Sequence, residues 1–157
     1  MRKILIVDDN SQNLYMLEVL LKTNGFEVET APNGAVALEL AQKLPPDMIV
    51  SDILMPSMDG FSFCHACKQD ETLKQIPFVF YTATYTEPKD ETFALNLAAD
   101  RFIIKPVAPE ELLNSIEEVF HNHQNKNLPS SSENESKETQ YYKQYNEVLI
   151  RKLEDKM

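Results

Sequence analysis

The feature that most constrains this chain is an alternation between two hydrophobic patterns over its first 121 residues. Short apolar runs, typical of strands buried on both faces, are separated by stretches whose apolar residues recur every three or four positions, the period of a helix. Elements that alternate in this way form a parallel sheet with helical crossovers, because the crossovers bury both faces of the sheet. The strands are expected at residues 4–7, 26–30, 48–50, 78–81 and 102–104.

The intervals between the strands carry helical stripes and helix-end signals. The stripes are Leu14, Leu17 and Leu21; Ala37, Leu40, Ala41 and Leu44; Phe93 and Leu97; and Leu113, Ile116 and Phe120, with a weaker helix at residues 61–69. Gly25 marks the end of the first helix, Asn33 and Gly34 the start of the second, and Pro109 the start of the last. The predicted fold class is α/β: a flavodoxin-like, doubly wound sheet of five parallel strands in the order 2-1-3-4-5 with five helices, formed by residues 1–121.

The composition changes after residue 121. Residues 122–140 are rich in Asn, Ser, Glu, Lys and Gln, which predicts a flexible linker. In residues 141–157 the apolar side chains, among them Tyr145 and Leu149, fall on one side of a helix that has no core of its own to cover. This segment is predicted to be a signalling or dimerisation helix. Its pattern runs to the last residue, as expected for a chain cut from a longer protein.

The charge distribution narrows the choice of partners. The formal net charge is -10, and residues 1–121 hold 19 Asp/Glu and 9 Lys/Arg, against six of each in residues 122–157. Such a surface repels nucleic-acid phosphates and anionic lipids. No apolar stretch approaches the roughly 18–20 residues of a membrane helix. We therefore expect a cytoplasmic protein that binds neither membranes nor nucleic acid directly.

The only two cysteines, Cys64 and Cys67, lie three residues apart in a predicted helix. This spacing does not suggest a disulfide framework and fits a reducing cytoplasm. A structural zinc site needs four ligands, and no second pair of ligands is spaced to complete one. Packing inside the fold is therefore favoured over a metal or redox role.

Polar residues follow four of the predicted strands. Asp8 and Asp9 come after the first strand, Asp52 after the third, Thr82 at the end of the fourth, and Lys105 after the fifth. In an open parallel sheet these strand ends meet at one edge, where ligands bind. Three carboxylates there repel one another unless protons or a cation neutralise them, and oxygen ligands select Mg²⁺. A carboxylate beside Mg²⁺, a lysine and a hydroxyl can accept a phosphoryl group.

Four motifs at these positions resemble the receiver domain of two-component response regulators. They are Ile6-Val7-Asp8-Asp9-Asn10, the nine residues Asp52-Ile53-Leu54-Met55-Pro56-Ser57-Met58-Asp59-Gly60, Tyr81-Thr82-Ala83, and the run from Ala99 to Pro106. The resemblance covers residues 1 to about 121, and it is the joint set that is specific. Singly, Asp8-Asp9 would equally fit a helix cap, Thr82 a turn, and Phe102 ordinary packing.

The resemblance implies a phosphorelay switch. Asp52 would accept a phosphoryl group from a histidine kinase or a His-phosphotransfer protein. The implied roles of the other residues are Mg²⁺ binding by Asp8, Asp9, Asp52 and the backbone carbonyl of Leu54; phosphoryl binding by Thr82 and Lys105; an aromatic switch at Phe102, which would turn inward behind Thr82; and a cis Lys105-Pro106 bond. The surface around the last strand would then repack, and a homodimer through that surface or through residues 141–157 is a further hypothesis.

Two departures from the family pattern carry expectations. The family often has Gly where Ala98 stands, which suggests a slightly different helix end. Leu54 and Thr84 occupy positions that tune dephosphorylation in the family. An apolar Leu54 cannot orient an attacking water, so the phosphoryl group is expected to be long-lived.

Three other functions fit parts of the same sequence pattern. An aspartyl-phosphate phosphatase would use a similar set of residues but wants a second Asp where Leu54 stands. A flavodoxin-like cofactor binder wants a phosphate loop where Asp8 and Asp9 would repel phosphate. A degenerate receiver would act only as a protein-binding scaffold. The chain itself would be a self-phosphorylating phosphoacceptor, either as a stand-alone regulator or as the receiver part of a hybrid or multidomain sensor histidine kinase.

Overall fold

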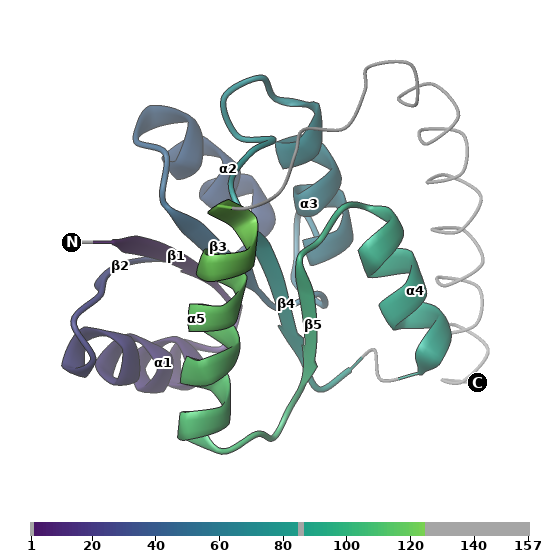
Figure 1. The fold of residues 1–157 in the computed structure, drawn as a ribbon. Helices are drawn as coiled ribbons and strands as arrows, with labels where there is room; N and C mark the ends of the chain where they lie inside the picture. Colours follow the sequence, from purple (N-terminus) through teal and green to yellow (C-terminus); the bar gives the residue numbers. More distant parts are fainter. Residues whose placement is uncertain (1, 85–86, 125–157) are drawn as a thin grey trace.

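The fold is an open sheet with helices on both faces (Figure 1). The structure is a computed structural model, and it describes residues 2–84 and 87–124. Five parallel strands lie in the order β2-β1-β3-β4-β5, which confirms the predicted topology. The predicted helix at 141–157 and all but the first three residues of the predicted linker lie outside the described residues.

The elements follow one another in strict alternation. The strands are β1 (Lys3–Val7), β2 (Glu27–Ala31), β3 (Met48–Ser51), β4 (Phe78–Thr82) and β5 (Arg101–Ile104). The helices are α1 (Ser11–Thr23), α2 (Gly34–Lys43), α3 (Gly60–Gln69), α4 (Pro88–Asn96) and α5 (Pro109–Gln124). Helix α5 thus continues three residues past the predicted domain boundary at 121. His123 in its last turn lies 3.7 Å from the Asp100 carboxylate beside β5, a contact that composition alone does not reveal.

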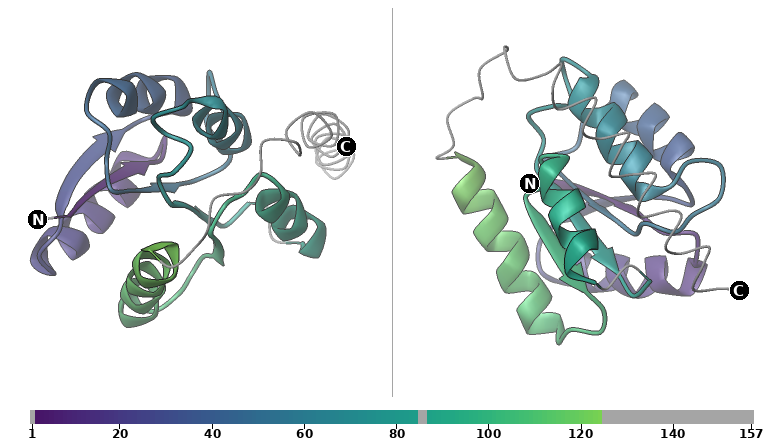
Figure 2. Two further views of the ribbon diagram at one scale, coloured as in Figure 1. Left: turned by 45° about the horizontal axis from the view of Figure 1, so that its top comes forward. Right: turned by 90° about the vertical axis from the view of Figure 1, so that its right-hand side faces the viewer.

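Two hydrophobic clusters fill the space between the sheet and the helices. Helices α1 and α5 cover one face, and α2, α3 and α4 cover the other (Figure 2). Alternate strand residues supply the two clusters, so that Leu5 and Val7 face the α2/α3/α4 side and Ile4 and Ile6 face the α1/α5 side. Among the helices of the described part, none is long and apolar enough to cross a membrane.

Helix α3 has a weak sequence signal but a strongly buried face. Phe61 packs edge-on against Phe80, at 5.5 Å between ring centroids, and Phe93, at 4.7 Å. Cys64 and Cys67 are fully buried in the same cluster. Burial raises the pKa of both thiols, that of Cys67 to about 12, so both stay protonated near neutral pH. They are core residues.

Helix α4 ends at a residue in the left-handed conformation. Ala98 has φ of 70°, its amide donates to Leu95 O, and the amide of Ala99 donates to Ala94 O. This is the helix ending that glycine usually provides. The expectation that Ala98 alters the helix end is therefore wrong: the glycine-type ending forms without glycine.

Candidate functional site

Backbone hydrogen bonds bring the polar strand ends to one edge of the sheet. The amide of Asp52 donates to Val7 O at 2.8 Å, so Asp8 and Asp52 follow neighbouring strands at the same level. The amide of Lys105 donates to Thr82 O, also at 2.8 Å. The parallel register therefore places Asp8, Asp52, Thr82 and Lys105 together. The Lys105-Pro106 peptide bond is cis.

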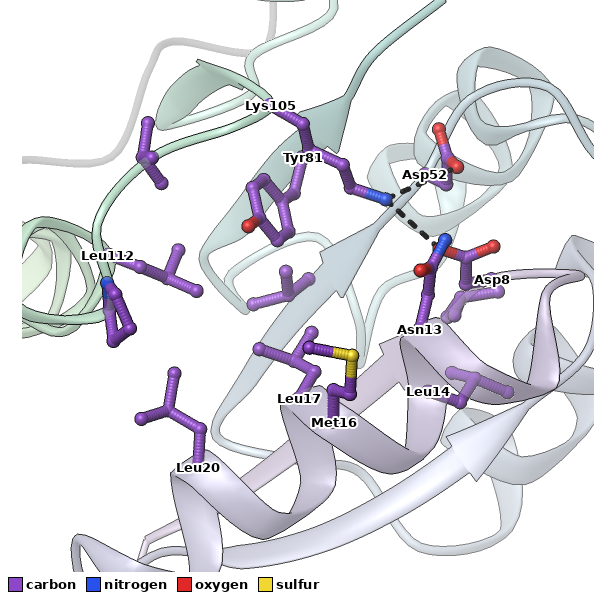
Figure 3. A pocket seen from close by; sticks show the side chains of 14 residues that line it. Asp8, Asn13, Leu14, Met16, Leu17, Leu20, Asp52, Tyr81, Lys105 and Leu112 are labelled. Carbon is purple, nitrogen blue, oxygen red and sulfur yellow. Dashed lines mark hydrogen bonds and ion pairs between the residues drawn. The ribbon is translucent and has the colours of Figure 1, made fainter.

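One ammonium group joins two carboxylates at this edge (Figure 3). Lys105 Nζ lies 3.1 Å from Asp8 Oδ2 and 3.6 Å from Asp52 Oδ2. The three side chains are only 18%, 10% and 13% exposed, so water screens these interactions weakly. One positive charge faces two negative charges, which leaves the group short of positive charge.

The carboxylates are also held by local hydrogen bonds. The backbone amide of Asn10 donates to Asp8 Oδ1 at 2.9 Å, and the Asn13 amide group donates to Asp8 Oδ2 at 3.4 Å. The amide of Ile53 donates to Asp52 Oδ1 at 2.7 Å. These bonds orient both carboxylates at the edge.

The pKa of Asp52 is raised above its ordinary value, chiefly because the carboxylate is buried. The Lys105 ammonium and the Ile53 amide oppose the rise, whereas the negative charge of Asp8 adds to it. A hydrogen bond from the Thr82 side chain is a smaller stabilising contact. Ionised Asp52 therefore lacks full compensation, which favours uptake of a proton or a cation.

The other predicted site residues take different positions. Asp9 is exposed, and within the described ranges no three His, Cys, Asp or Glu side chains are grouped so as to hold a metal ion. Asp9 lies in a bend next to Asp8, at the same edge of the sheet, just after β1 ends at Val7. The Leu54 side chain is 45% exposed in the loop after Asp52. The donors nevertheless fit Mg²⁺, because carboxylate oxygens short of positive charge are its preferred ligands.

Thr82 and Phe102 share the α2/α3/α4 side of the sheet. Thr82 is fully buried, and its Oγ1 accepts a hydrogen bond from the amide of Thr84 at 3.2 Å. Phe102 is 9% exposed and lies 6.2 Å, between ring centroids, from Phe80. The aromatic side chain is thus inward in this structure.

Gly60, the first residue of α3, lies against the backbone of Asp52. Its amide donates to Ile53 O at 2.8 Å, and a Cβ at this position would lie 2.8 Å from Ile53 Cα and closer still to Asp52 O. Only glycine allows this approach. The start of α3 is therefore fixed directly to the segment that carries Asp52.

A pocket of about 250 Å³ adjoins the charged group on the α1/α5 side (Figure 3). Asp8, Asp52 and Lys105 line its polar end, and Leu14, Leu17 and Leu112 are among its apolar lining residues. Sequence reasoning missed the pocket, since it depends on the spacing between two helices. Sequence reasoning also missed that Tyr81 lines the pocket, although its place in β4 directly before Thr82 was a signal that it lies near the site.

Comparisons with known proteins identify the family. The pattern of the response regulator receiver domain matches residues 4–117. The chain belongs to the response regulator receiver domain family. Histidine kinases are the partner class that this membership implies, and receiver domains generally bind Mg²⁺ for phosphorylation.

Relatives of this receiver domain include both sequences and solved structures. It is 34% identical to "Probable transcriptional regulator ycf27" of Cyanophora paradoxa, over 85% of this chain and 54% of that protein. It is 40% identical to "Response regulator PleD" of Caulobacter vibrioides, over 67% and 23%. Chemotaxis protein CheY4 of Vibrio cholerae superposes with a TM-score of 0.72 at 38% identity, over 76% of this chain and 98% of that one. The chain thus spans about half or less of the length of its two curated relatives, the ycf27 protein and PleD.

Proposed function

We propose that this receiver domain accepts a phosphoryl group on Asp52 from the phosphohistidine of a histidine kinase or a His-phosphotransfer protein. The observation that carries the proposal is the Lys105 ammonium held between Asp8 and Asp52 at the carboxyl edge of the sheet. This arrangement sets a buried nucleophilic carboxylate beside a cation that can follow the negative charge of an incoming phosphoryl group.

In the proposed transfer, an Asp52 carboxylate oxygen attacks phosphorus as the N–P bond of phosphohistidine breaks. The electron pair of that bond returns to the imidazole nitrogen, and Asp52 becomes an acyl phosphate. Lys105 then pairs with a phosphoryl oxygen. Asp8, Asp9, Asp52 and the Leu54 carbonyl would hold Mg²⁺, which when bound neutralises negative charge on phosphoryl oxygens.

The response would pass through Thr82 and Phe102. We propose that the Thr82 hydroxyl turns to donate a hydrogen bond to the phosphoryl group, and that Phe102 packs behind it. The inward position of Phe102 beside Phe80 supports this proposal, because it places the ring on the side of the sheet that Thr82 faces. Phosphorylation would then shift the population toward one arrangement of the surface formed by α4, β5 and α5.

The proposed setting is the cytoplasm, with no direct binding to nucleic acid or membranes. The net charge of -10 supports the absence of such binding, since an anionic surface repels both nucleic acid and anionic membranes. A homodimer through the α4, β5 and α5 surface or through residues 141–157 is part of the proposal. A monomer in light scattering, with and without beryllofluoride as the phosphoryl mimic, would contradict it.

Intact mass measurement tests the phosphoacceptor directly. The protein is incubated with acetyl phosphate and Mg²⁺, in parallel with Asp52→Asn and with EDTA. One added phosphoryl group, lost with either change, is the expected result. No adduct, and no change in the NMR spectrum with beryllofluoride, would instead support a scaffold role. Turnover of a phosphomonoester would support the phosphatase alternative, which the Leu54 side chain disfavours.

A further inference from the structure

We infer that Tyr81 is a positioning residue for Lys105, holding the ammonium group at the charged edge through the face of its aromatic ring. The inference rests on the proposed phosphoacceptor function and adds to it a role for Tyr81, a motif residue to which the family resemblance assigned none. Lys105 Nζ lies 4.8 Å from the centroid of the Tyr81 ring. Tyr81, Lys105, Asp8 and Asp52 meet at the same end of the pocket (Figure 3).

The ring restricts an otherwise flexible side chain. A lysine ammonium on a four-carbon stem readily turns out to water, and the two nearby carboxylates attract it from only one side. The electron-rich face of an aromatic ring attracts a cation, and more strongly where water is scarce. The Lys105 side chain is 18% exposed, which meets that condition. Tyr81 thus supplies a second attraction that confines the ammonium.

This confinement matters when the charge at Asp52 changes. On phosphorylation, one Asp52 oxygen becomes part of the acyl phosphate and the negative charge moves outward onto the phosphoryl oxygens. The contact from Asp52 to Lys105 must then be replaced, whereas the contact from Tyr81 is unaltered. The ring therefore keeps the ammonium at the edge while its anionic partner is exchanged.

Strand alternation explains why this residue serves the site. Thr82 faces the α2/α3/α4 side, so Tyr81 must face the α1/α5 side, where it packs against the cluster beside the pocket. Two successive residues of β4 therefore act on the phosphoacceptor edge from opposite faces of the sheet. The Thr82 hydroxyl approaches Asp52, and the Tyr81 ring approaches Lys105.

The test separates the ring from apolar bulk. Tyr81→Phe keeps the aromatic face and removes the hydroxyl, whereas Tyr81→Leu keeps an apolar lining without a ring. Tyr15→Leu on α1, where the tyrosine is 67% exposed, is the matched control for losing a tyrosine elsewhere. Acetyl phosphate with Mg²⁺ serves as the phosphodonor, so that docking of a protein partner does not enter the measurement.

Two readouts are compared across the wild type and these three variants. The first is the NMR shift of the Lys105 Hε protons, which a ring face moves upfield. We expect this upfield shift in the wild type, Tyr81→Phe and Tyr15→Leu, and its loss in Tyr81→Leu. The second is the phosphorylation rate, which should fall about 3- to 10-fold in Tyr81→Leu and recover in Tyr81→Phe.

The possible results separate this inference from the proposed function. An upfield shift that persists in Tyr81→Leu, or equal rates in the wild type and Tyr81→Leu, overturns the role of Tyr81 and leaves the function of Asp52 standing. A rate that falls as much in Tyr81→Phe as in Tyr81→Leu also overturns it. A wild type that takes up no phosphoryl group contradicts the proposed function, and the role of Tyr81 with it, whatever the NMR shift.

Discussion

Asp52 combines two demands that oppose each other. A phosphoacceptor carboxylate must be ionised to attack phosphorus, yet burial favours its neutral form. Lys105 and the Ile53 amide compensate only in part, and Asp8 adds a second negative charge. The ionised Asp52 carboxylate therefore lowers the stability of the fold, as is common for residues that serve reactivity.

Replacing this carboxylate should stabilise the protein. In metal-free buffer at pH 7, Asp52→Asn should raise the free energy of unfolding by about 1 kcal/mol, because it removes an incompletely compensated buried charge. The folded state retains a proton on Asp52 at pH values where the unfolded chain, with its ordinary pKa of 3.8, has released it. The wild type should therefore lose stability as the pH rises through the interval above 3.8, and the loss is complete above the folded pKa.

Urea unfolding of both proteins between pH 4 and 8 measures this effect. The difference between Asp52→Asn and the wild type should be small at pH 4, grow as the pH rises, and then level off. A difference that is independent of pH would show that Asp52 is not the cause.

The exposed Leu54 side chain gives a second prediction at this scale. Leu54→Asn should shorten the lifetime of the acyl phosphate about 10-fold, because an amide can orient an attacking water and an apolar side chain cannot. The phosphorylated fraction is followed by intact mass after the phosphodonor is removed. Leu95→Asn on α4 is the matched control, since Leu95 is 47% exposed and Leu54 is 45% exposed. Equal decay in all three proteins would mean that residue 54 does not control the lifetime.

At the scale of the elements, the residue that ends α4 has a strained backbone conformation, which a substitution by glycine can relieve. Ala98 follows the helix with φ of 70°, a conformation that costs a residue with a Cβ about 1–2 kcal/mol. The hydrogen bonds from the amides of Ala98 and Ala99 to Leu95 O and Ala94 O hold the backbone in this conformation. This helix borders the surface proposed to change on phosphorylation, so its stability bears on the response.

Ala98→Gly should raise the free energy of unfolding by about 0.5–1 kcal/mol. The gain is smaller than the strain because glycine loses more backbone entropy on folding. Ala35→Gly, at an exposed position of α2, should instead lower stability by a similar amount. Thermal and urea unfolding of the two variants would give shifts of opposite sign. If Ala98→Gly had a lower free energy of unfolding than the wild type, the proposed strain at Ala98 would be contradicted.

The sequence predicted the elements better than the details of the site. Continuous apolar runs such as Ile4 to Val7 require a sheet buried on both faces, and the parallel topology then brings Asp8, Asp52 and Lys105 together without further information. The pair of Tyr81 and Lys105, the exposure of Asp9 and the left-handed Ala98 depend on side-chain directions and on competition between local contacts. The hydrophobic pattern does not record these.

For the whole molecule, the acidic charge raises the question of how specifically it responds to cations. Any salt screens the repulsion within a net charge of -10. A specifically bound Mg²⁺ adds a stabilisation that grows with the ratio of the Mg²⁺ concentration to its dissociation constant, and that reaches about 2.7 kcal/mol when the ratio is about 100. We expect Mg²⁺ to raise the unfolding temperature of the wild type beyond the effect of NaCl at equal ionic strength.

Asp8→Asn should abolish this additional stabilisation. Glu39→Gln, which removes one exposed negative charge from α2, should retain it and serves as the matched control. Thermal unfolding in the two salts makes the comparison. An equal response of all three proteins to Mg²⁺ and NaCl would show general screening alone.

Strand β4 presents Tyr81 and Thr82 to opposite layers of helices. A substitution at position 81 alters the layer beside the pocket, and one at position 82 alters the layer that holds Phe102. Because the Tyr81 ring approaches Lys105 and the Thr82 hydroxyl approaches Asp52, a substitution packed into either layer of helices alters the same charged edge.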